Sequence, residues 1–206
     1  MTGWPLDLLD WKRRVFGMYA DVRVAGGDPA ASSAFRAARD ELFRSHPQSP
    51  LPAERRAGFA GLDWFPYRPD LRVEAALEPD PADEPLVVRT GTGEPIRLRR
   101  VGRVRPVLGG VAVELAVYWL EGYGGGLFLP FRDLLAGRET YGGGRYLLDT
   151  VKGADLGTSP DGARLVLDFN YAYNPSCAYD PRWSCPLAPP ENRLAVAVPA
   201  GERTVH

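Results

Sequence analysis

The hydrophobic pattern of this chain changes its period once, shortly after residue 50, and this change restricts the fold more than any other feature of the sequence. Near the N-terminus the apolar side chains recur at steps of three and four residues, which is the spacing of one helix face. These side chains are Leu8, Trp11, Val15, Met18 and Val22. The same spacing recurs in residues 33–44, where Ser32 or Ser33 is placed to cap the helix. The pattern predicts helices over residues 5–24 and 32–45.

From residue 58 onward the period is two, as expected of strands with one buried face. Residues 71–77 show this alternation, and similar short runs follow toward the end of the chain. The further predicted strands are PLVVRT, IRLRRVGRVRPVL, VAVELAVYWL and residues 127–131, 145–151, 164–169 and 194–199. Gly109-Gly110 is typical of a hairpin turn, and the tail GERTVH is expected to fray.

These periods predict a mainly β (α+β) fold, in which an N-terminal two-helix arm packs on an antiparallel β-barrel or sandwich. We expect a single domain over residues 1–206, with the arm in residues 1–50 and a β-rich body in residues 58–200. The 23 glycines and 20 prolines suit short strands with shaped loops better than a helical bundle.

Charge and hydropathy argue against several classes of partner. The 206 residues carry 25 basic and 26 acidic side chains, so the chain lacks the basic excess that is typical of nucleic-acid-binding proteins. No apolar run reaches the roughly 20 residues of a membrane span. The N-terminal residues lack the basic-then-apolar order of a signal peptide. We therefore expect a cytoplasmic protein with no nucleic-acid and no membrane partner, and the sequence leaves its oligomeric state open.

The segment DFNYAYNPSCAYDPRWSCPLAPPENRL, residues 168–194, combines both cysteines of the chain with five prolines. Because a proline-rich segment is stiff, we expect residues 170–192 to pack as a lid over an open end of the β-rich body. Two interpretations of Asp168 and Asn170 stay open. They orient a ligand at the mouth of the body, or they bond to the irregular backbone that follows them.

A second polar set lies beside the glycine run of TYGGGRY. If the strands that begin near Tyr146 and Arg164 are consecutive neighbours and antiparallel, Arg145 lies beside Asp168, and we expect the two to pair. The glycine amides together with Arg145 also suit an anion, whereas a bend that only glycine adopts explains the same residues structurally.

The cysteines and the internal histidine suggest an enzyme alternative. Cys177 as nucleophile, His46 as base and Asp168 as the orienting carboxylate would form a triad for a hydrolase or transferase. A structural interpretation competes, because a buried cysteine is commonly inert and His46 follows a helix whose C-terminus it can cap. In a reducing compartment, and with too few ligands for zinc, Cys177 and Cys185 are expected to be reduced and to bind no metal. No cofactor is expected.

Three stretches stand out together: RDELFRSHPQSPL (residues 39–51) with FAGLDWFPY after it, LFLPFRDLLAGRETYGGGRYLLD (residues 127–149), and residues 168–194. They resemble a bacterial family known only as a domain of unknown function, DUF1684. The resemblance indicates which segments matter and implies no particular activity.

These observations favour a binding protein whose small polar or anionic ligand lies in a pocket beneath the proline-rich loop. Glu191 is expected to clamp Arg145 or Arg182, or to act as an acid or base. The predicted ligand-binding residues are Tyr141, Arg145, Asp168, Asn170, Tyr173, Asn174, Glu191 and Asn192. The alternatives are the enzyme with Cys177, His46 and Asp168, and a structural protein whose loop docks a partner.

Overall fold

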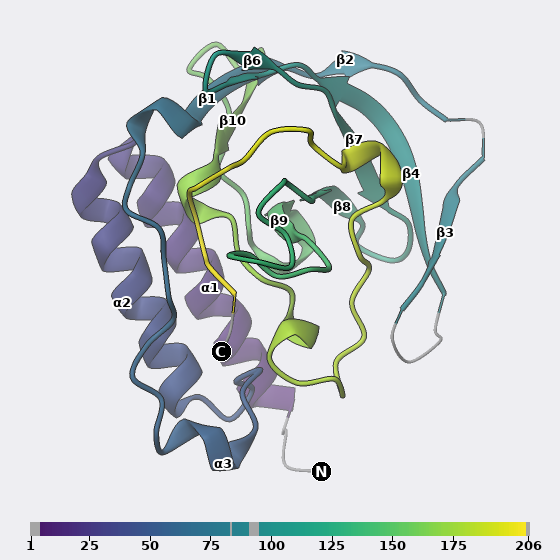
Figure 1. The fold of residues 1–206 in the computed structure, drawn as a ribbon. Coiled ribbons are helices and arrows are strands. Elements are labelled where there is room, and N and C mark those ends of the chain that lie inside the picture. The colour runs from purple at the N-terminus through teal and green to yellow at the C-terminus, as the bar shows by residue number, and fades with distance from the viewer. Residues whose placement is uncertain (1–4, 83, 91–94, 205–206) are drawn as a thin grey trace.

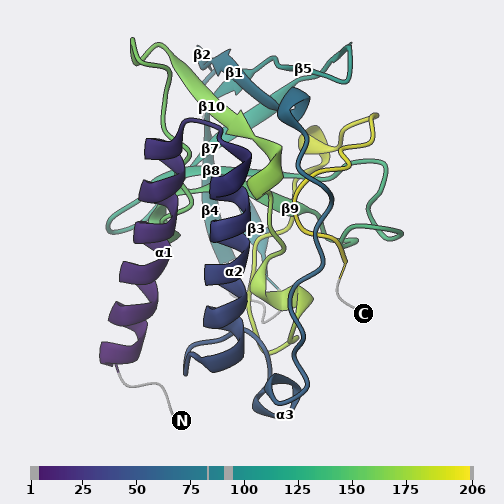
Figure 2. The ribbon, with the colours of Figure 1, turned by 90° about the vertical axis from the view of Figure 1, so that its left-hand side faces the viewer.

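Both expected helices form the N-terminal arm. The computed structural model describes residues 5–82, 84–90 and 95–204. Helix α1 spans Pro5–Ala25, α2 spans Pro29–Ser45, and a single turn, α3, spans Ala53–Arg56. In Figures 1 and 2 the two long helices lie side by side along one flank of the strands. The predicted arm is confirmed.

Helix α2 begins at Pro29, so the prediction that Ser32 or Ser33 caps it is wrong. Its cap is Asp28, whose side chain accepts a hydrogen bond from the Ala30 N–H at 2.9 Å. Pro29 suits the first turn, because its missing N–H would have no partner inside the helix.

The described strands pair antiparallel, and the mainly β (α+β) fold class is confirmed. The largest sheet has the order β2-β4-β7-β8-β9, and β3 also pairs with β4. These strands are β2 (Glu78–Pro79), β3 (Leu86–Arg89), β4 (Pro95–Val104), β7 (Leu115–Leu120), β8 (Gly126–Phe131) and β9 (Arg145–Asp149). In a separate sheet β1 (Arg72–Ala76) pairs with β10 (Arg164–Asp168). Within the described residues the strand order does not close into a barrel.

A two-residue turn joins β5 (Val107–Leu108) to β6 (Val111–Ala112). Gly109 and Gly110 have φ angles of 57° and 84°, so the turn has the left-handed geometry that favours glycine at both positions. The predicted hairpin is confirmed. Short 3-10 helices lie at Pro69–Leu71, Thr150–Lys152, Phe169–Tyr171, Ser176–Ala178 and Pro190–Asn192.

The arm and the strands share one hydrophobic core. Tyr19 and Val22 of α1 and Phe35 of α2 are buried in the same cluster as residues of β7 to β10. The Phe35 ring meets Tyr171, which follows β10, edge to face at a centroid distance of 5.0 Å. This contact fixes the arm against the start of the proline-rich loop.

The expected pairing of β9 with β10 is wrong. β9 pairs with β8, and β10 pairs with β1. The segment that follows β10 does contact β9. Tyr146 of β9 and Tyr173, which lies after the end of β10, exchange two main-chain hydrogen bonds of 2.9 and 3.0 Å. The start of the proline-rich loop, rather than β10, therefore lies beside the start of β9.

Two expectations for the C-terminus are also wrong. Residues 194–199 form no strand, because their main-chain groups bond to scattered partners: the Leu194 N–H to the Arg132 oxygen, the Val196 oxygen to the Leu134 N–H, and Val198 to the side chains of Asp133 and Arg145. The tail does not fray up to Thr204: the Phe65 N–H bonds to Gly201, and the Arg203 N–H bonds to Asp63. Only glycine fits at Gly201, whose φ is +78° and where a Cβ would lie 2.5 Å from the Ala172 oxygen. His206 and its neighbour lie outside the described residues.

Asn192 ties the end of the proline-rich loop to the large sheet. Its side chain accepts from the Ala116 N–H at 2.8 Å and donates to the Ala116 oxygen at 2.9 Å and to the Pro130 oxygen at 2.7 Å. The residue is fully buried. These bonds supply partners to main-chain groups of β7 and β8 beyond the last residues that the two strands pair, Tyr118 and Phe128.

We predict that Asn192→Ala lowers the free energy of unfolding by roughly 2–5 kcal/mol, because it leaves buried main-chain groups without partners. Chemical denaturation measures the loss. Arg193→Ala is the matched control on the exposed neighbouring position and should change stability by less than about 0.5 kcal/mol. Equal stability of the two variants would contradict this role of Asn192.

Candidate functional site

Arg145, expected to bind a ligand, lies inside the core and holds the C-terminal segment. It is 1% exposed, and its guanidinium donates to three main-chain oxygens. These belong to Val198, Ala200 and Glu202. Its acidic partner is Asp133, with a nitrogen–oxygen distance of 3.6 Å. Burial lowers the pKa of Arg145 to about 10. The predicted Arg145–Asp168 pair is wrong, because Asp168 lies on a strand that pairs with β1.

Asp168 and Asn170 bond to nearby backbone, as one of the two interpretations anticipated. Asp168 accepts from the Asn170 N–H at 3.0 Å and from its side-chain amide at 2.8 Å. The Asn170 side chain bonds to the N–H and the oxygen of Arg68 at 2.7 and 2.8 Å. Burial raises the pKa of Asp168. Asp168 also borders a hollow of about 260 Å³ together with Arg72. Asn174 borders a different hollow, between the helices and the loop, so Asp168 and Asn174 do not line the single pocket that was expected.

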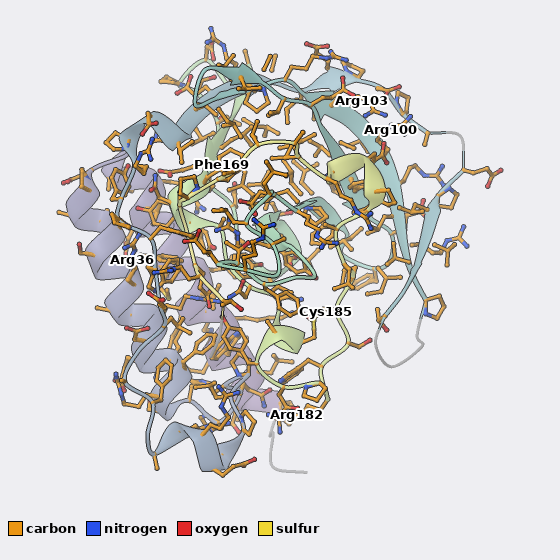
Figure 3. All side chains as sticks on the ribbon, viewed as in Figure 1. Arg36, Arg100, Arg103, Phe169, Arg182 and Cys185 are labelled. Atoms are coloured by element: carbon orange, nitrogen blue, oxygen red, sulfur yellow. The ribbon has the colours of Figure 1, made fainter. Side chains whose placement is uncertain are left out.

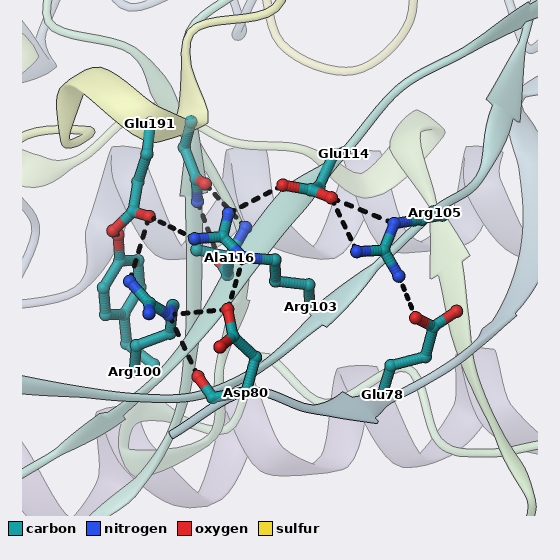
Figure 4. A network of polar contacts seen from close by, with 10 residues as sticks. Glu78, Asp80, Arg100, Arg103, Arg105, Glu114, Ala116 and Glu191 are labelled. Atoms are coloured by element: carbon teal, nitrogen blue, oxygen red, sulfur yellow. Dashed lines mark hydrogen bonds and ion pairs between the residues drawn. The ribbon is translucent and has the colours of Figure 1, made fainter. Parts of the chain in front are cut away.

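Glu191 clamps the loop to the sheet, but with other arginines than expected. Its carboxylate accepts from Arg100 at 3.4 Å, from Arg103 at 3.1 Å, and from the Tyr118 hydroxyl. Figure 4 shows this network of polar contacts, and Figure 3 places Arg100 and Arg103 on the flank away from the helices. Arg145 is buried elsewhere, and Arg182 pairs with Asp180 at 3.1 Å. Each arginine of the network already has an acidic partner.

The structure does not bring the three residues of the proposed triad together. His46 ends α2, and its Nε2 lies 3.3 Å from the carboxylate of Asp10. Its Nδ1 accepts from the Gln48 N–H at 3.0 Å. Asp168 is bonded to Asn170, as described above, while Cys177 lies 3.8 Å from the Tyr141 hydroxyl. His46 is the C-cap residue of α2 through its main-chain N–H, which donates to the Leu42 oxygen, while its ring contacts groups outside α2.

Asn174 leads instead to a buried carboxylate that the sequence did not single out, Glu202. Glu202 is 1% exposed, and one of its oxygens accepts from Arg39 and from the Asn174 N–H, each at 3.2 Å. The other oxygen accepts from the Tyr179 hydroxyl. The carboxylate thus joins helix α2, the proline-rich loop and the C-terminal segment. Burial raises its pKa, and the charge of Arg39 opposes that rise.

A cavity of about 60 Å³ lies beside this cluster, between the helices and the loop, and we call it the arm cavity. Its aromatic walls are Trp11, Tyr19, Phe43, Tyr173 and Tyr179. The Arg39 guanidinium lies over two of these rings, 4.7 Å from the Phe43 centroid and 5.1 Å from that of Tyr173. These contacts hold the guanidinium plane in place.

Three residues that line the arm cavity each carry a buried polar atom with no hydrogen-bond partner within the described part of the chain. These atoms are the Tyr19 hydroxyl, Nε of Arg39 and Oδ1 of Asn174. They come from α1, α2 and the proline-rich loop, so no single local motif explains them. Buried polar groups in proteins are nearly always paired, so these three atoms make the arm cavity the candidate site.

A larger cleft of about 390 Å³ adjoins the same cluster. It is lined by residues of the segment 51–63, by residues 202–204 and by Tyr179, which also borders the arm cavity. The Tyr179 ring and the Glu202 carboxylate therefore lie between the two hollows.

Of the predicted ligand-binding residues, Tyr173 and Asn174 border the arm cavity. Sequence reasoning missed Tyr19, Arg39, Tyr179 and Glu202. Arg39 and Glu202 are 163 positions apart, and neither belongs to a motif. The one available signal is that Arg39 opens RDELFRSHPQSPL, a stretch that carried the family resemblance.

We predict that the stability difference between the wild type and Glu202→Gln depends on pH. A carboxyl whose pKa is raised on folding stabilises the protein fully below its unfolded value of 4.5, and that contribution is lost as the pH rises through the folded pKa. The wild-type advantage should therefore shrink as the pH rises above 4.5, by about 1.4 kcal/mol for each unit by which the pKa is raised. Urea denaturation across the pH range measures it.

Glu41→Gln is the control with the opposite sign. Hydrogen bonds from Ser45 and Arg44 lower the pKa of Glu41, so its contribution should be lost as the pH falls instead. If the wild-type advantage over Glu202→Gln grew with rising pH, Arg39 rather than burial would dominate the Glu202 carboxyl.

No described helix combines the length and the apolar character that crossing a membrane requires. Groups of three or more potential metal ligands are likewise missing from the described residues.

Comparison with known proteins places the chain in a family. Residues 57–203 match the family described as "Protein of unknown function (DUF1684)". Among solved structures, the chain is similar to an uncharacterised protein of Haloarcula marismortui determined by solution NMR. The two share 38% sequence identity and a TM-score of 0.59, over 84% of this chain and 91% of that chain. A search of curated proteins found no match. By the span of the family match and by its identity to this relative, the chain belongs to the DUF1684 family.

Proposed function

We propose that this protein binds a small carboxylate that also carries a hydrogen-bond donor, and that the ligand occupies the arm cavity. The observation that carries the proposal is that three residues lining one hollow, Tyr19, Arg39 and Asn174, each carry a buried polar atom without a partner within the described residues. The sequence predicts a small polar or anionic ligand beneath the proline-rich loop. The proposed ligand belongs to this class and lies against the same loop.

The donors and acceptors of the cavity define the chemistry of the ligand. Arg39 Nε is a donor, the Tyr19 hydroxyl is a donor or an acceptor, and Asn174 Oδ1 is an acceptor. A carboxylate takes the bonds from Arg39 and Tyr19, since Arg39 presents a planar fork to it. The remaining acceptor on Asn174 requires a hydroxyl or amino group on the ligand.

Two cations belong to the lining of the arm cavity, Arg39 and Lys152. Glu202 takes one bond from the Nη2 group of Arg39 and leaves Nε unpaired within the described residues. Lys152 adds a second cation to the cavity lining, at 3.4 Å from Asp149. Both cations already pair with a carboxylate, so the bond that a ligand carboxylate would gain comes from the unpaired Nε of Arg39.

The volume limits the size of the ligand. A water molecule occupies about 30 Å³ in the liquid, so a cavity of about 60 Å³ holds two waters or one molecule of a few heavy atoms. Glycolate has this size and carries both the carboxylate and the donor. Acetate lacks the donor, and glycolamide lacks the charge.

We predict that glycolate raises the melting temperature of the wild type more than acetate does, and that glycolamide has no effect. Acetate leaves the Asn174 acceptor unpaired, and glycolamide gives Arg39 no charge to bind. Thermal unfolding across a titration of each probe, followed by calorimetry for any that binds, provides the measurement. Failure of glycolate to bind at millimolar concentration would contradict the proposed ligand class.

Tyr19→Phe tests the site without removing any hydrogen bond seen within the described residues. We expect the free variant to be as stable as the wild type or more stable, because a buried hydroxyl without a partner is lost. Its affinity for glycolate should fall about tenfold or more, the effect of losing a bond to a charged group. Tyr123→Phe is the matched control, since Tyr123 is fully exposed. Equal affinities of the two variants would contradict the site.

A further inference from the structure

The two cysteines of the proline-rich loop form a hydrogen-bonded pair. The Cys177 N–H donates to the sulfur of Cys185 at 3.4 Å, and the two thiols lie close enough to affect the pKa of each other. Both thiols are free. Figure 3 shows Cys185 at the inner side of the loop, next to the short helix that carries Cys177. The Cys185 sulfur therefore contacts the main chain of Cys177.

The two sulfurs have different surroundings. Cys185 is 4% exposed, whereas Cys177 is partly exposed. The Tyr141 hydroxyl lies 3.8 Å from the Cys177 sulfur. The bond from Cys177 lowers the pKa of Cys185, and Lys152 lowers it further, while the same bond raises the pKa of Cys177. The pair therefore releases one proton more readily than an ordinary thiol and retains the second.

We propose that Cys177 and Cys185 form a dithiol site that reduces small hydroperoxides and closes into a reversible disulfide. The site is separate from the arm cavity and does not depend on the proposed carboxylate ligand. Its substrate class is a peroxide small enough to reach the partly exposed Cys177 sulfur.

The chemistry balances with the peroxide as the only oxidant. Once the pair has lost one proton, the remaining proton lies mainly on Cys177. When a peroxide reaches the partly exposed Cys177 sulfur, this proton passes to Cys185 and leaves the reacting thiolate on Cys177. This thiolate attacks the peroxide oxygen, forms a sulfenic acid and releases hydroxide or alkoxide, which takes up a proton. The Cys185 sulfur then attacks the Cys177 sulfur, a disulfide forms, and water leaves. With hydrogen peroxide, two thiols are oxidised and two waters are produced.

The loop keeps the two thiols within reach of each other. Seven residues separate them, and Pro175, Pro181 and Pro186 limit the conformations of this segment. The Tyr146 hydroxyl bonds to the Pro186 oxygen at 2.5 Å and holds the residue next to Cys185 in place. A sulfenic acid on Cys177 therefore forms beside its resolving thiol.

The test is oxidation of the full chain by hydrogen peroxide, followed by alkylation and intact mass measurement. We expect the loss of two hydrogens, two thiols closed to alkylation, and recovery of both on adding dithiothreitol. The folded protein should react about tenfold or more faster than the urea-unfolded chain at the same slightly acidic pH, where ordinary thiols are almost fully protonated. Equal rates, or a disulfide found only between two chains, would overturn the proposal.

Serine variants separate the two roles. Cys185→Ser should leave a sulfenic acid on Cys177 that dimedone traps, and Cys177→Ser should stop disulfide formation and slow oxidation of the buried Cys185. Oxidation of Met18 adds an oxygen and is distinguished by mass. If Cys185→Ser yields no trapped sulfenic acid while the wild type forms no disulfide, the proposal fails, whatever the result of the glycolate titration.

Discussion

The buried Glu202 carboxylate is the interaction on which the rest of the structure depends. Its oxygens accept bonds from Arg39 on α2 and from Asn174 and Tyr179 in the proline-rich loop. Its main-chain oxygen accepts from Arg145, at the start of β9. Taking a carboxylate out of water is costly, and the penalty is offset only when every oxygen finds partners of this kind. One residue near the C-terminus therefore determines how the arm, the loop and the sheet meet.

The arm cavity is a consequence of this docking. Tyr19 and Arg39 come from the helices, while Tyr173 and Asn174 come from the loop that returns to β9. The family match covers residues 57–203, so both helices lie outside the matched segment. The three residues of the arm cavity that carry polar atoms unpartnered within the described residues belong to the arm, for Tyr19 and Arg39, and to the matched body, for Asn174. A ligand that contacts both the arm and the body binds only when the arm is docked. Its binding therefore stabilises the docked arm.

The sequence predicted what local patterns control. The period of the apolar side chains located both helices and most strands, and Gly109-Gly110 located the hairpin. Residues 194–199 alternate as a strand does, yet the side chains of Asp133 and Arg145 take the main-chain groups of Val198, and no local pattern reveals side chains that distant. The start of α2 was misplaced because Asp28 and Pro29 act together as a cap, whereas Ser32 points into the core.

The candidate site was only partly predictable for the same reason. Asn174 was recognised as a polar residue in an unusual loop, but its acceptor meets Tyr19 and Arg39 only through tertiary packing. Arg145 and Asp168 were expected to pair because their strands are consecutive, and the sheet order separates them. Glu202 is a single acidic residue in a short tail, so nothing in its neighbourhood marks it as buried.

A high-resolution crystal structure of the protein grown with glycolate tests the central claim most directly. We predict continuous density in the arm cavity that reaches the Tyr19 hydroxyl, Arg39 Nε and Asn174 Oδ1 at hydrogen-bonding distances. Two separate water peaks in the same place, unchanged with and without glycolate, would contradict the account and show that the three groups are satisfied by solvent.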